Sequence, residues 1–278
     1  MSPSGQKQQE IFEHALSLFS KQQYSTALKE FRKITQQSLQ ILKHYYIGLC
    51  FVQLGYFEKA LESYKKIHEI PATVQGVEYD RIMYGLYINM GSVLQKLAKK
   101  HGMEYYREAK KCYTYALEIK SSDERVWNNL GNVYLEMEHY LEAIRCFNKA
   151  LKLNPEFPAA YYCLSLVHEY QKKKKKAIEY LKKELQWKPR NKVILNRLAG
   201  LLFGTKHFDE ALHYAQKVIE YYPHDLKALE SLVLIHYNLD NIDQAVACYK
   251  KLQSFHPEFE PRETEAIFKD LKKLIENK

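Results

Sequence analysis

The sequence predicts an all-α protein in which helical hairpins stack into a solenoid. Two residue series carry this prediction, because both keep a period of 34 residues along the second half of the chain. The alanines of the first series are Ala143, Ala177, Ala211 and Ala245, and the prolines of the second are Pro155, Pro189, Pro223 and Pro257. Two residue types that share one period over four units indicate a repeated structural unit. Only ten glycines and eight prolines interrupt the 278 residues, which leaves room for long helices.

The segment 124–157 shows what each position of the unit does. Trp127, Leu130 and Tyr134 have helical spacing along one face of a first helix, and Phe147 from a second helix is expected to fill the space beside them. Gly131 keeps side-chain volume low where the two helices nearly touch. Small residues recur at its equivalent positions, namely Ala15, Gly48, Gly91, Ser165 and Ala199. The proline of each unit then ends the second helix, since it cannot donate the next backbone hydrogen bond.

This spacing resembles the tetratricopeptide repeat, and the residues from Trp127 to Pro155 fill every position of that family's signature. The resemblance implies a right-handed α-α superhelix over residues 8–259, built of about seven helical hairpins, with a C-terminal capping helix in 260–278. The expected repeats are 8–40, 41–74, 84–123, 124–157, 158–191, 192–225 and 226–259.

Two segments depart from the regular unit. The third repeat reaches its alanine, Ala109, six residues late, which predicts a lengthened first helix from near Val77 through Lys100 with a break at His101-Gly102. The pattern of residues 263–277 predicts one amphipathic helix with a Lys/Glu-rich outer side, as a solenoid cap requires. Its expected apolar face consists of Ile267, Phe268, Leu271, Leu274 and Ile275.

The resemblance also implies that the first helix of each repeat lines a concave groove. The polar residues expected to face into that groove are Asn89, Arg125, Asn128, Asn129, Asn132, Asn196 and Arg197. Asparagine amides both donate and accept hydrogen bonds, so a row of them can pair with the backbone of an extended peptide. The two arginines are expected to hold an acidic residue of that peptide through forked hydrogen bonds. The alternative is that these residues are simply solvated.

Aromatic residues are expected on the same inner wall. Phe12, Tyr45 and Tyr46 in the first two repeats predict an apolar groove for an amphipathic helix of a partner, and Tyr162 continues the wall in the fifth repeat. The alternative is that the N-terminal segment or the curvature of the superhelix covers these rings.

The distribution of charge along the chain limits the classes of partner that we expect. The net charge is +9, but residues 158–191 alone contribute +6, and much of that excess lies in the run Lys172–Lys176. A nucleic-acid solenoid should spread its charge along the binding face, so nucleic-acid binding is not predicted. The lysine run is expected in the turn of the fifth repeat, either solvated or in peripheral contact with an acidic partner or anionic lipid.

The five cysteines are odd in number, scattered and without a C-x-x-C pair, which argues against disulfides and a zinc site. No apolar stretch predicts a membrane span, and none near residue 1 predicts a signal peptide, so a cytoplasmic location is expected.

No catalytic motif, metal site or cofactor-binding signature is present in the sequence. We therefore expect a non-enzymatic scaffold or adaptor that binds a peptide or helical segment of another protein. Three alternatives stay open at this point. The chain could be a structural subunit that uses its convex or end surfaces, or, with less support, a secretion-type chaperone or an RNA-binding helical-repeat protein.

Overall fold

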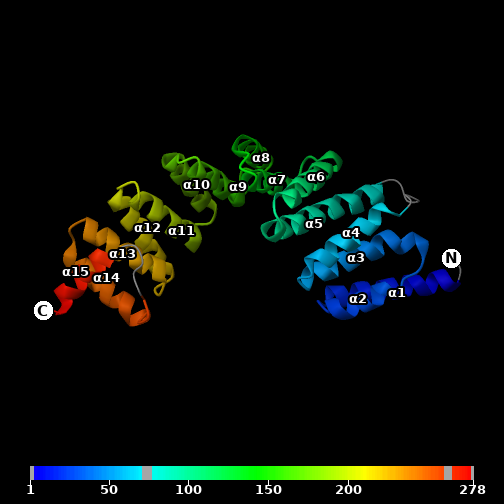
Figure 1. Cartoon of the computed structure of the whole chain (residues 1–278), viewed down its shortest axis with the longest axis horizontal. Coiled ribbons are helices and arrows are strands. Elements are labelled where there is room, and N and C mark those ends of the chain that lie inside the picture. Colours follow the sequence, from blue (N-terminus) through cyan, green and yellow to red (C-terminus); the bar gives the residue numbers. More distant parts are fainter. Residues whose placement is uncertain (1–2, 71–76, 260–264, 277–278) are drawn as a thin grey trace. The chain divides into compact units, whose positions relative to one another are not determined.

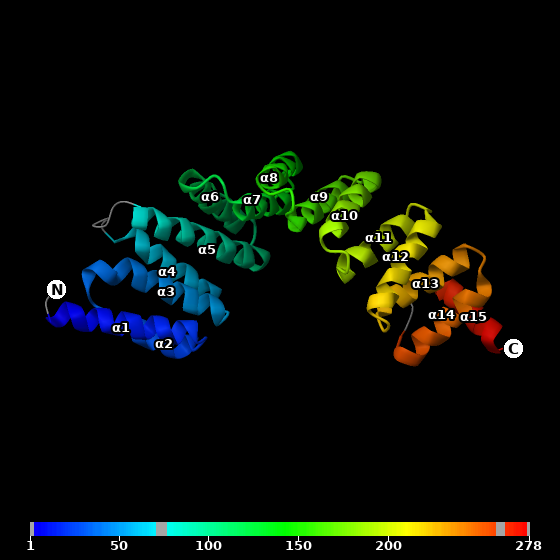
Figure 2. The same cartoon turned by 180° about the vertical axis from the view of Figure 1, so that it is seen from behind.

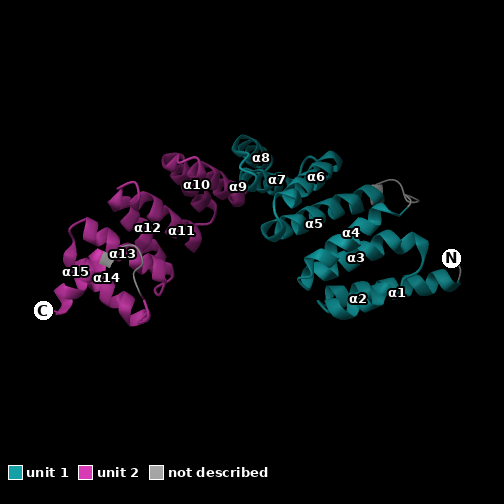
Figure 3. Cartoon of the chain, in the orientation of Figure 1, with its two compact units in different colours: residues 1–155 teal, residues 156–278 magenta. Residues whose placement is uncertain are grey.

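The computed structural model describes residues 3–70, 77–259 and 265–276. Within these residues the chain forms fifteen α-helices and one short 3-10 helix, η1 (Gln37–Leu39), and no strand, which confirms the all-α fold. The chain divides into two compact units, residues 1–155 and 156–278 (Figure 3).

Helices α1 to α8 belong to unit 1. Their bounds are α1 Pro3–Ser20, α2 Tyr24–Arg32, α3 Gln40–Gln53, α4 Phe57–His68, α5 Val77–His101, α6 Met103–Ile119, α7 Glu124–Glu136 and α8 Tyr140–Leu153. Helices α9 to α15 belong to unit 2. Their bounds are α9 Pro158–Tyr170, α10 Lys174–Trp187, α11 Lys192–Phe203, α12 Phe208–Tyr221, α13 Leu226–Asn238, α14 Ile242–Phe255 and α15 Glu265–Glu276.

Consecutive helices pack as hairpins within each unit. In unit 1 the pairs are α1 with α2, α3 with α4, α5 with α6 and α7 with α8 (Figure 1). Helices α2, α4 and α6 also pack on the first helix of the next pair. Unit 2 repeats this arrangement with α9 and α10, α11 and α12, and α13 and α14, while α15 packs on α14 (Figure 2). Stacking lets each hairpin bury an apolar face that it could not bury alone.

The glycines of the first helices lie against aromatic rings of the second helices. A Cβ atom added to Gly131 would lie 2.5 Å from the ring of Phe147, and one added to Gly91 would lie 2.8 Å from the ring of Tyr113. Gly48 makes the same close approach to Tyr64. The expectation that small residues mark the closest helix contacts is confirmed at these three positions.

The lengthened helix of the third repeat is also confirmed. Helix α5 runs from Val77 to His101, and Gly102 breaks the chain with a φ of 98° before α6 begins. A left-handed φ of this kind favours glycine. Residues 71–74, at the end of the expected second repeat, lie outside the described part of the chain.

The turn inside most hairpins uses a left-handed residue that carries a side chain. The residues of this set, all with φ between 59° and 61°, are Gln22, Glu138, Lys172, Lys206 and Asp240. The last four are spaced by 34 residues, so one turn geometry is reused from hairpin to hairpin. In the second hairpin Gly55, with a φ of 79°, takes this conformation instead.

Helix α15 covers the end of unit 2. Phe268 and Leu271 are buried in a cluster with residues of α13 and α14 such as Leu229 and Tyr249. The expected apolar face is therefore confirmed at its centre, but the prediction for Leu274 was wrong, because that side chain is exposed. Residues 260–264 of the expected cap lie outside the described residues.

Glu184 is a buried carboxyl in the core of unit 2. It occupies the position that Ala150, Val218 and Leu252 hold at intervals of 34 residues, and it is only 4% exposed. Its Oε1 atom accepts a hydrogen bond from Asn191 Nδ2 at 3.3 Å, while Oε2 is buried without a hydrogen-bond partner among the described residues. Burial raises the pKa of Glu184 to about 7, although Lys188 and Asn191 act in the opposite direction.

The close approach at Gly131 predicts a sharp cost for one added methyl group. Gly131→Ala should lower the free energy of unfolding by about 1–3 kcal/mol, because the Phe147 ring must move from a packed site. Gly200→Ala is the matched control, since a Cβ atom there would meet nothing within 4 Å, and it should stabilise helix α11 by about 1 kcal/mol. Urea unfolding followed by circular dichroism measures both, and equal effects of the two substitutions would contradict this packing.

The raised pKa of Glu184 predicts that stability falls as pH rises. Between about 4.5, the ordinary value, and about 7, the unfolded state loses the proton while the folded state keeps it. The folded state should lose up to about 3 kcal/mol across this window relative to a variant without the carboxyl.

Urea unfolding at pH 5 and pH 8 tests this for the native chain, Glu184→Gln and Glu184→Leu. Glu184→Leu restores the apolar character of the equivalent positions and should be more stable than the native chain at pH 8. The same pH dependence in all three proteins would show that Glu184 titrates normally.

Candidate functional site

The N-terminus of several first helices is capped by a side chain at one repeated position. Asp123 accepts a hydrogen bond from the Arg125 backbone N–H, Asn191 from that of Val193, and Asp225 from that of Ala228. These capping residues satisfy backbone donors that have no partner inside the helix. In both units a capping carboxylate also binds a side chain of the preceding first helix, and these contacts organise the two polar networks described next.

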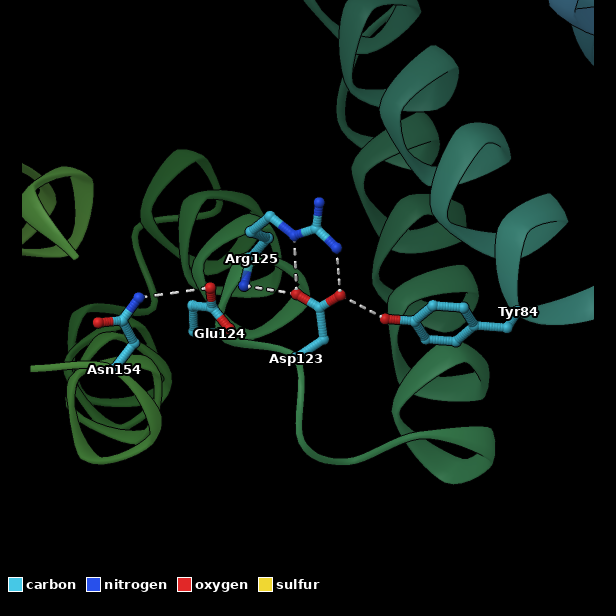
Figure 4. A network of polar contacts seen from close by, with 5 residues as sticks. All are labelled: Tyr84, Asp123, Glu124, Arg125 and Asn154. Atoms are coloured by element: carbon cyan, nitrogen blue, oxygen red, sulfur yellow. Dashed lines mark hydrogen bonds and ion pairs between the residues drawn. The ribbon is translucent and has the colours of Figure 1, made fainter. Parts of the chain in front are cut away.

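The network of unit 1 centres on Asp123, which is 4% exposed (Figure 4). Tyr84 of α5 donates its hydroxyl to Asp123 Oδ2 at 2.7 Å, and Arg125 donates through Nε at 3.1 Å to Oδ1 and through Nη2 at 2.8 Å to Oδ2. Burial by itself would raise the pKa of Asp123, but the hydrogen bonds from Arg125 and Tyr84 outweigh it and hold the pKa well below its ordinary value. Asp123 is therefore a charged anchor between α5 and α7.

This geometry gives two of the expected groove residues a different environment. Arg125 pairs with Asp123 through Nε and Nη2, but its side chain is 72% exposed, so its contact with an acidic residue of a partner stays a prediction. Asn128 is buried rather than presented to a groove, and its Oδ1 has no hydrogen-bond partner among the described residues. Asn129 and Asn132 are half-buried and keep part of their surface exposed.

The aromatic residues of the first hairpins are used in packing. Phe12 is 6% exposed, so its prediction as a partner contact is corrected to a core position. Tyr46 packs against Phe12, Phe31 and other rings, with centroid distances of 5.4 Å to Phe31 and 5.8 Å to Phe12. The Tyr45 hydroxyl accepts a hydrogen bond from Asn89 Nδ2 at 3.1 Å, which joins α3 to α5. Tyr45 and Tyr46 are half-buried and keep part of their surface exposed, so contact of these two rings with a partner stays a prediction.

Unit 2 has a pocket of about 500 Å³ at the N-terminal ends of α11 and α13. Two of the predicted site residues, Asn196 and Arg197, line it. The other lining residues are Lys192, Val193, Asp225, Leu226 and Lys227. Val193 is 58% exposed and Leu226 is 38% exposed, so the pocket presents apolar surface beside its charged groups.

Hydrogen bonds fix the polar side of this pocket. Asn196 Nδ2 donates to Asp225 Oδ1 at 3.0 Å, and Lys192 Nζ lies 3.1 Å from Asp225 Oδ2. Burial alone would raise the pKa of Asp225, but the bonds from Asn196, the Ala228 backbone and Lys192 lower it overall. Asp225 is thus held as a carboxylate that ties α11 to α13.

Arg197 is held from the other side by α9. Its Nε and Nη2 atoms donate to the two carboxylate oxygens of Glu169 at 2.7 Å and 3.0 Å, and its Nη1 donates to the Tyr162 hydroxyl at 3.3 Å. Its guanidinium also lies 5.6 Å from the centre of the Tyr162 ring. The fork of Arg197 already binds a carboxylate of the chain, so its contact with an acidic residue of a partner stays a prediction. Arg197 thus contacts Tyr162, another of the residues predicted for the inner wall.

The sequence analysis did not predict the exposed residues that line this pocket. Lys192 and Val193 begin α11, and Leu226 and Lys227 begin α13 at the equivalent positions 34 residues later. An exposed apolar residue beside a lysine at the start of two successive first helices was the signal that could have found them.

The cysteines and the potential metal ligands form no reactive or metal-binding site among the described residues. All five cysteines are free, and burial raises the pKa of Cys50, Cys112, Cys146 and Cys163 to about 12, so these groups are protonated thiols that pack in the core. Among the described residues no group of three or more His, Cys, Asp or Glu side chains has a metal-binding arrangement.

The lysine run is exposed throughout. It lies only partly in a turn, because Lys174, Lys175 and Lys176 already form the first turn of α10. Cations at a helix N-terminus are unfavourable toward the helix dipole.

Family models for the tetratricopeptide repeat match residues 124–157, 158–191 and 197–258. The chain is a tetratricopeptide-repeat protein. Members of this class use their stacked helices as scaffolds for protein interactions, and in that general sense the chain is an interaction scaffold. No curated protein sequence is significantly similar to it.

Solved structures of other tetratricopeptide-repeat proteins share the fold. A repeat protein from Cytophaga hutchinsonii has a TM-score of 0.69 at 18% identity, with 90% of this chain and 96% of that chain covered. One from Parabacteroides merdae has a TM-score of 0.64 at 17% identity, covering 96% of this chain and 98% of its own. YrrB, described as having an unusual peptide-binding site, has a TM-score of 0.53 at 24% identity, with 78% and 97% covered.

Among the described residues, no helix is both long enough and apolar enough to span a membrane.

The Asp123 network predicts that the Tyr84 hydroxyl stabilises unit 1. Tyr84→Phe should lower the free energy of unfolding by about 1–3 kcal/mol, because a buried carboxylate loses a hydrogen bond. Tyr115→Phe in α6, where the ring is exposed, is the control and should change little. In an Asp123→Ala background the Tyr84→Phe exchange should also lose most of its effect in urea unfolding. An undiminished effect there would show that the hydroxyl acts through another partner.

Proposed function

We propose that this protein is a non-catalytic scaffold whose unit 2 binds an extended segment of a partner protein in the pocket between α11 and α13. The observation that carries the proposal is the combination of exposed Val193 and Leu226 with Lys227 around one pocket of about 500 Å³. An apolar side chain of the partner can pack on the first two residues while an acidic neighbour pairs with Lys227.

Hydrogen bonds fix the polar wall of the pocket. Asn196 is held by its bond to Asp225, and its Oδ1 atom is buried beneath the pocket surface. The networks around Asp225 and Arg197 hold the wall rigid before binding, which reduces the entropy lost on association.

The proposal assigns the remaining predicted residues different roles. Arg197 binds both Tyr162 and Glu169 and so positions the wall of the pocket. In unit 1, Asn129 and Asn132 offer a further polar surface on α7. Phe12 and Asn128 are left out as contacts because they are buried. The likeness to YrrB, whose description names a peptide-binding site, is consistent with this class of function but is too distant to identify a ligand. We also propose a cytoplasmic setting, in line with the five free cysteines.

Selection from a random-peptide display library tests the proposal. The peptides that the full chain selects should combine an apolar residue with a nearby acidic one. The double variant Val193→Ser/Lys227→Glu should bind the selected peptides about tenfold more weakly, because it removes both exposed contacts without touching the internal networks.

The matched control is Leu141→Ser/Lys175→Glu, which alters an exposed leucine and an exposed lysine away from the pocket. It should bind as the native chain does. Equal binding by the native chain and both double variants would place the peptide site elsewhere and reject the proposal.

A further inference from the structure

A second pocket lies in unit 1, away from the helix faces discussed so far. It has a volume of about 420 Å³ and is formed by the end of α2, one side of α3 and one side of α4. Ile47 and Phe51 of α3 supply apolar lining. The charged and titratable groups around it are Arg32, Lys43, His44, Lys59, Glu62 and Lys66.

The positive charge of this pocket is not neutralised by the protein. Four cations face one carboxylate, Glu62, and no salt bridge joins any of the four to an acidic group in the part of the chain that the structure describes. Three of the four contact neutral groups instead. The Arg32 guanidinium lies 5.9 Å from the centre of the Phe51 ring, Lys59 Nζ lies 5.0 Å from the Tyr56 ring, and Lys43 Nζ donates to the Ile34 carbonyl at 2.7 Å.

Burial and neighbouring positive charge act on two of the residues that line the pocket, Lys43 and His44. Burial and the charge of Lys66 lower the pKa of Lys43. Burial, Lys43 and Lys66 lower the pKa of His44, and Glu69 offsets this only in part. Like charges that lie near one another repel, and an anion bound between them relieves the repulsion. The positive charge of the pocket therefore favours a ligand of high negative charge.

We propose that this pocket, formed by Arg32, Lys43, Lys59 and Lys66, binds a phosphoryl group. A phosphoryl monoester carries a charge of about −1.5 to −2 at neutral pH and several strong acceptor oxygens. It therefore suits a pocket lined by four cationic side chains better than a carboxylate with a single charge does. The arginine provides a planar fork for two of those oxygens, and the lysines provide flexible point charges. The pocket is larger than one phosphoryl group, and the apolar floor of Ile47 and Phe51 can take the carbon atoms of the group that carries it.

Titration calorimetry of the full chain at low salt tests the proposal with two probes. The first is inorganic pyrophosphate, and the second is a short peptide with one phosphoserine, compared with the same peptide unphosphorylated. Either phosphorylated probe should bind and the unphosphorylated peptide should not. Tighter binding of pyrophosphate would identify a free phosphorylated compound as the source, and tighter binding of the phosphopeptide would identify a modified protein segment. Failure of both probes to bind would overturn the proposal.

A pair of double variants locates the site. Lys59→Gln/Lys66→Gln should weaken binding by about tenfold or more, because two charge-assisted contacts are lost. Both side chains are exposed, so the fold should persist, as circular dichroism can verify. Lys172→Gln/Lys175→Gln removes the same charge from the exposed lysine run and should leave binding unchanged. Equal weakening by both would mean that the anion responds only to net charge, and would reject the site.

Ring signals in a histidine NMR spectrum give an independent readout. Addition of the probe should shift the His44 signals, because His44 lines the pocket, and should leave those of exposed His139 in place. An unmoved His44 in the presence of bound probe would also contradict the proposal. This site does not depend on the peptide pocket of unit 2, so Val193→Ser/Lys227→Glu should bind pyrophosphate normally.

Discussion

The close approach between the two helices of a hairpin is the contact on which the rest of unit 1 depends. At Gly48, Gly91 and Gly131 the first helix has no side chain, and a ring of the second helix lies where a Cβ would be. Interiors packed at this density tolerate little change of volume. The rings of Tyr64, Tyr113 and Phe147 are completely buried as a result. Because the hairpins are held at this spacing, the next first helix arrives at a fixed distance, and side chains from successive first helices can reach each other.

The contacts between successive first helices are polar and have a shared design. A carboxylate that caps one first helix accepts a hydrogen bond from a side chain on the first helix before it, as Tyr84 does with Asp123 in unit 1 and Asn196 with Asp225 in unit 2. The carboxylate therefore accepts hydrogen bonds from a backbone N–H at the start of its own helix and from a side chain of the preceding first helix. These two contacts fix the register between the two helices. Both carboxylates are charged, and they position the side chains beside them. In unit 2 those groups surround an open pocket, which is why the interaction site is assigned there.

The periodic residues of the sequence were sufficient to predict the helical hairpins, because packing volume and helix termination depend on residues near in sequence. This holds even for the irregular helix α5, whose end is marked by Gly102. The groove residues were predicted less well. Arg197 and Glu169 are separated by 28 residues, Asn196 and Asp225 by 29, and Tyr84 and Asp123 by 39. Nothing in the residue types shows whether such a polar side chain meets another part of the chain or faces solvent, so side chains expected to contact a partner were found to make internal contacts.

The turns of the hairpins have a consequence for how this scaffold can be altered. Five of them place a residue with a side chain in the left-handed region, at a cost of about 1 kcal/mol each relative to glycine. Where two such positions have no neighbours in common, their contributions should add. Replacing these five residues by glycine or asparagine should therefore raise the thermal stability of the repeats step by step. None of the five lines either pocket, so the binding surfaces could then be redesigned on a more stable framework.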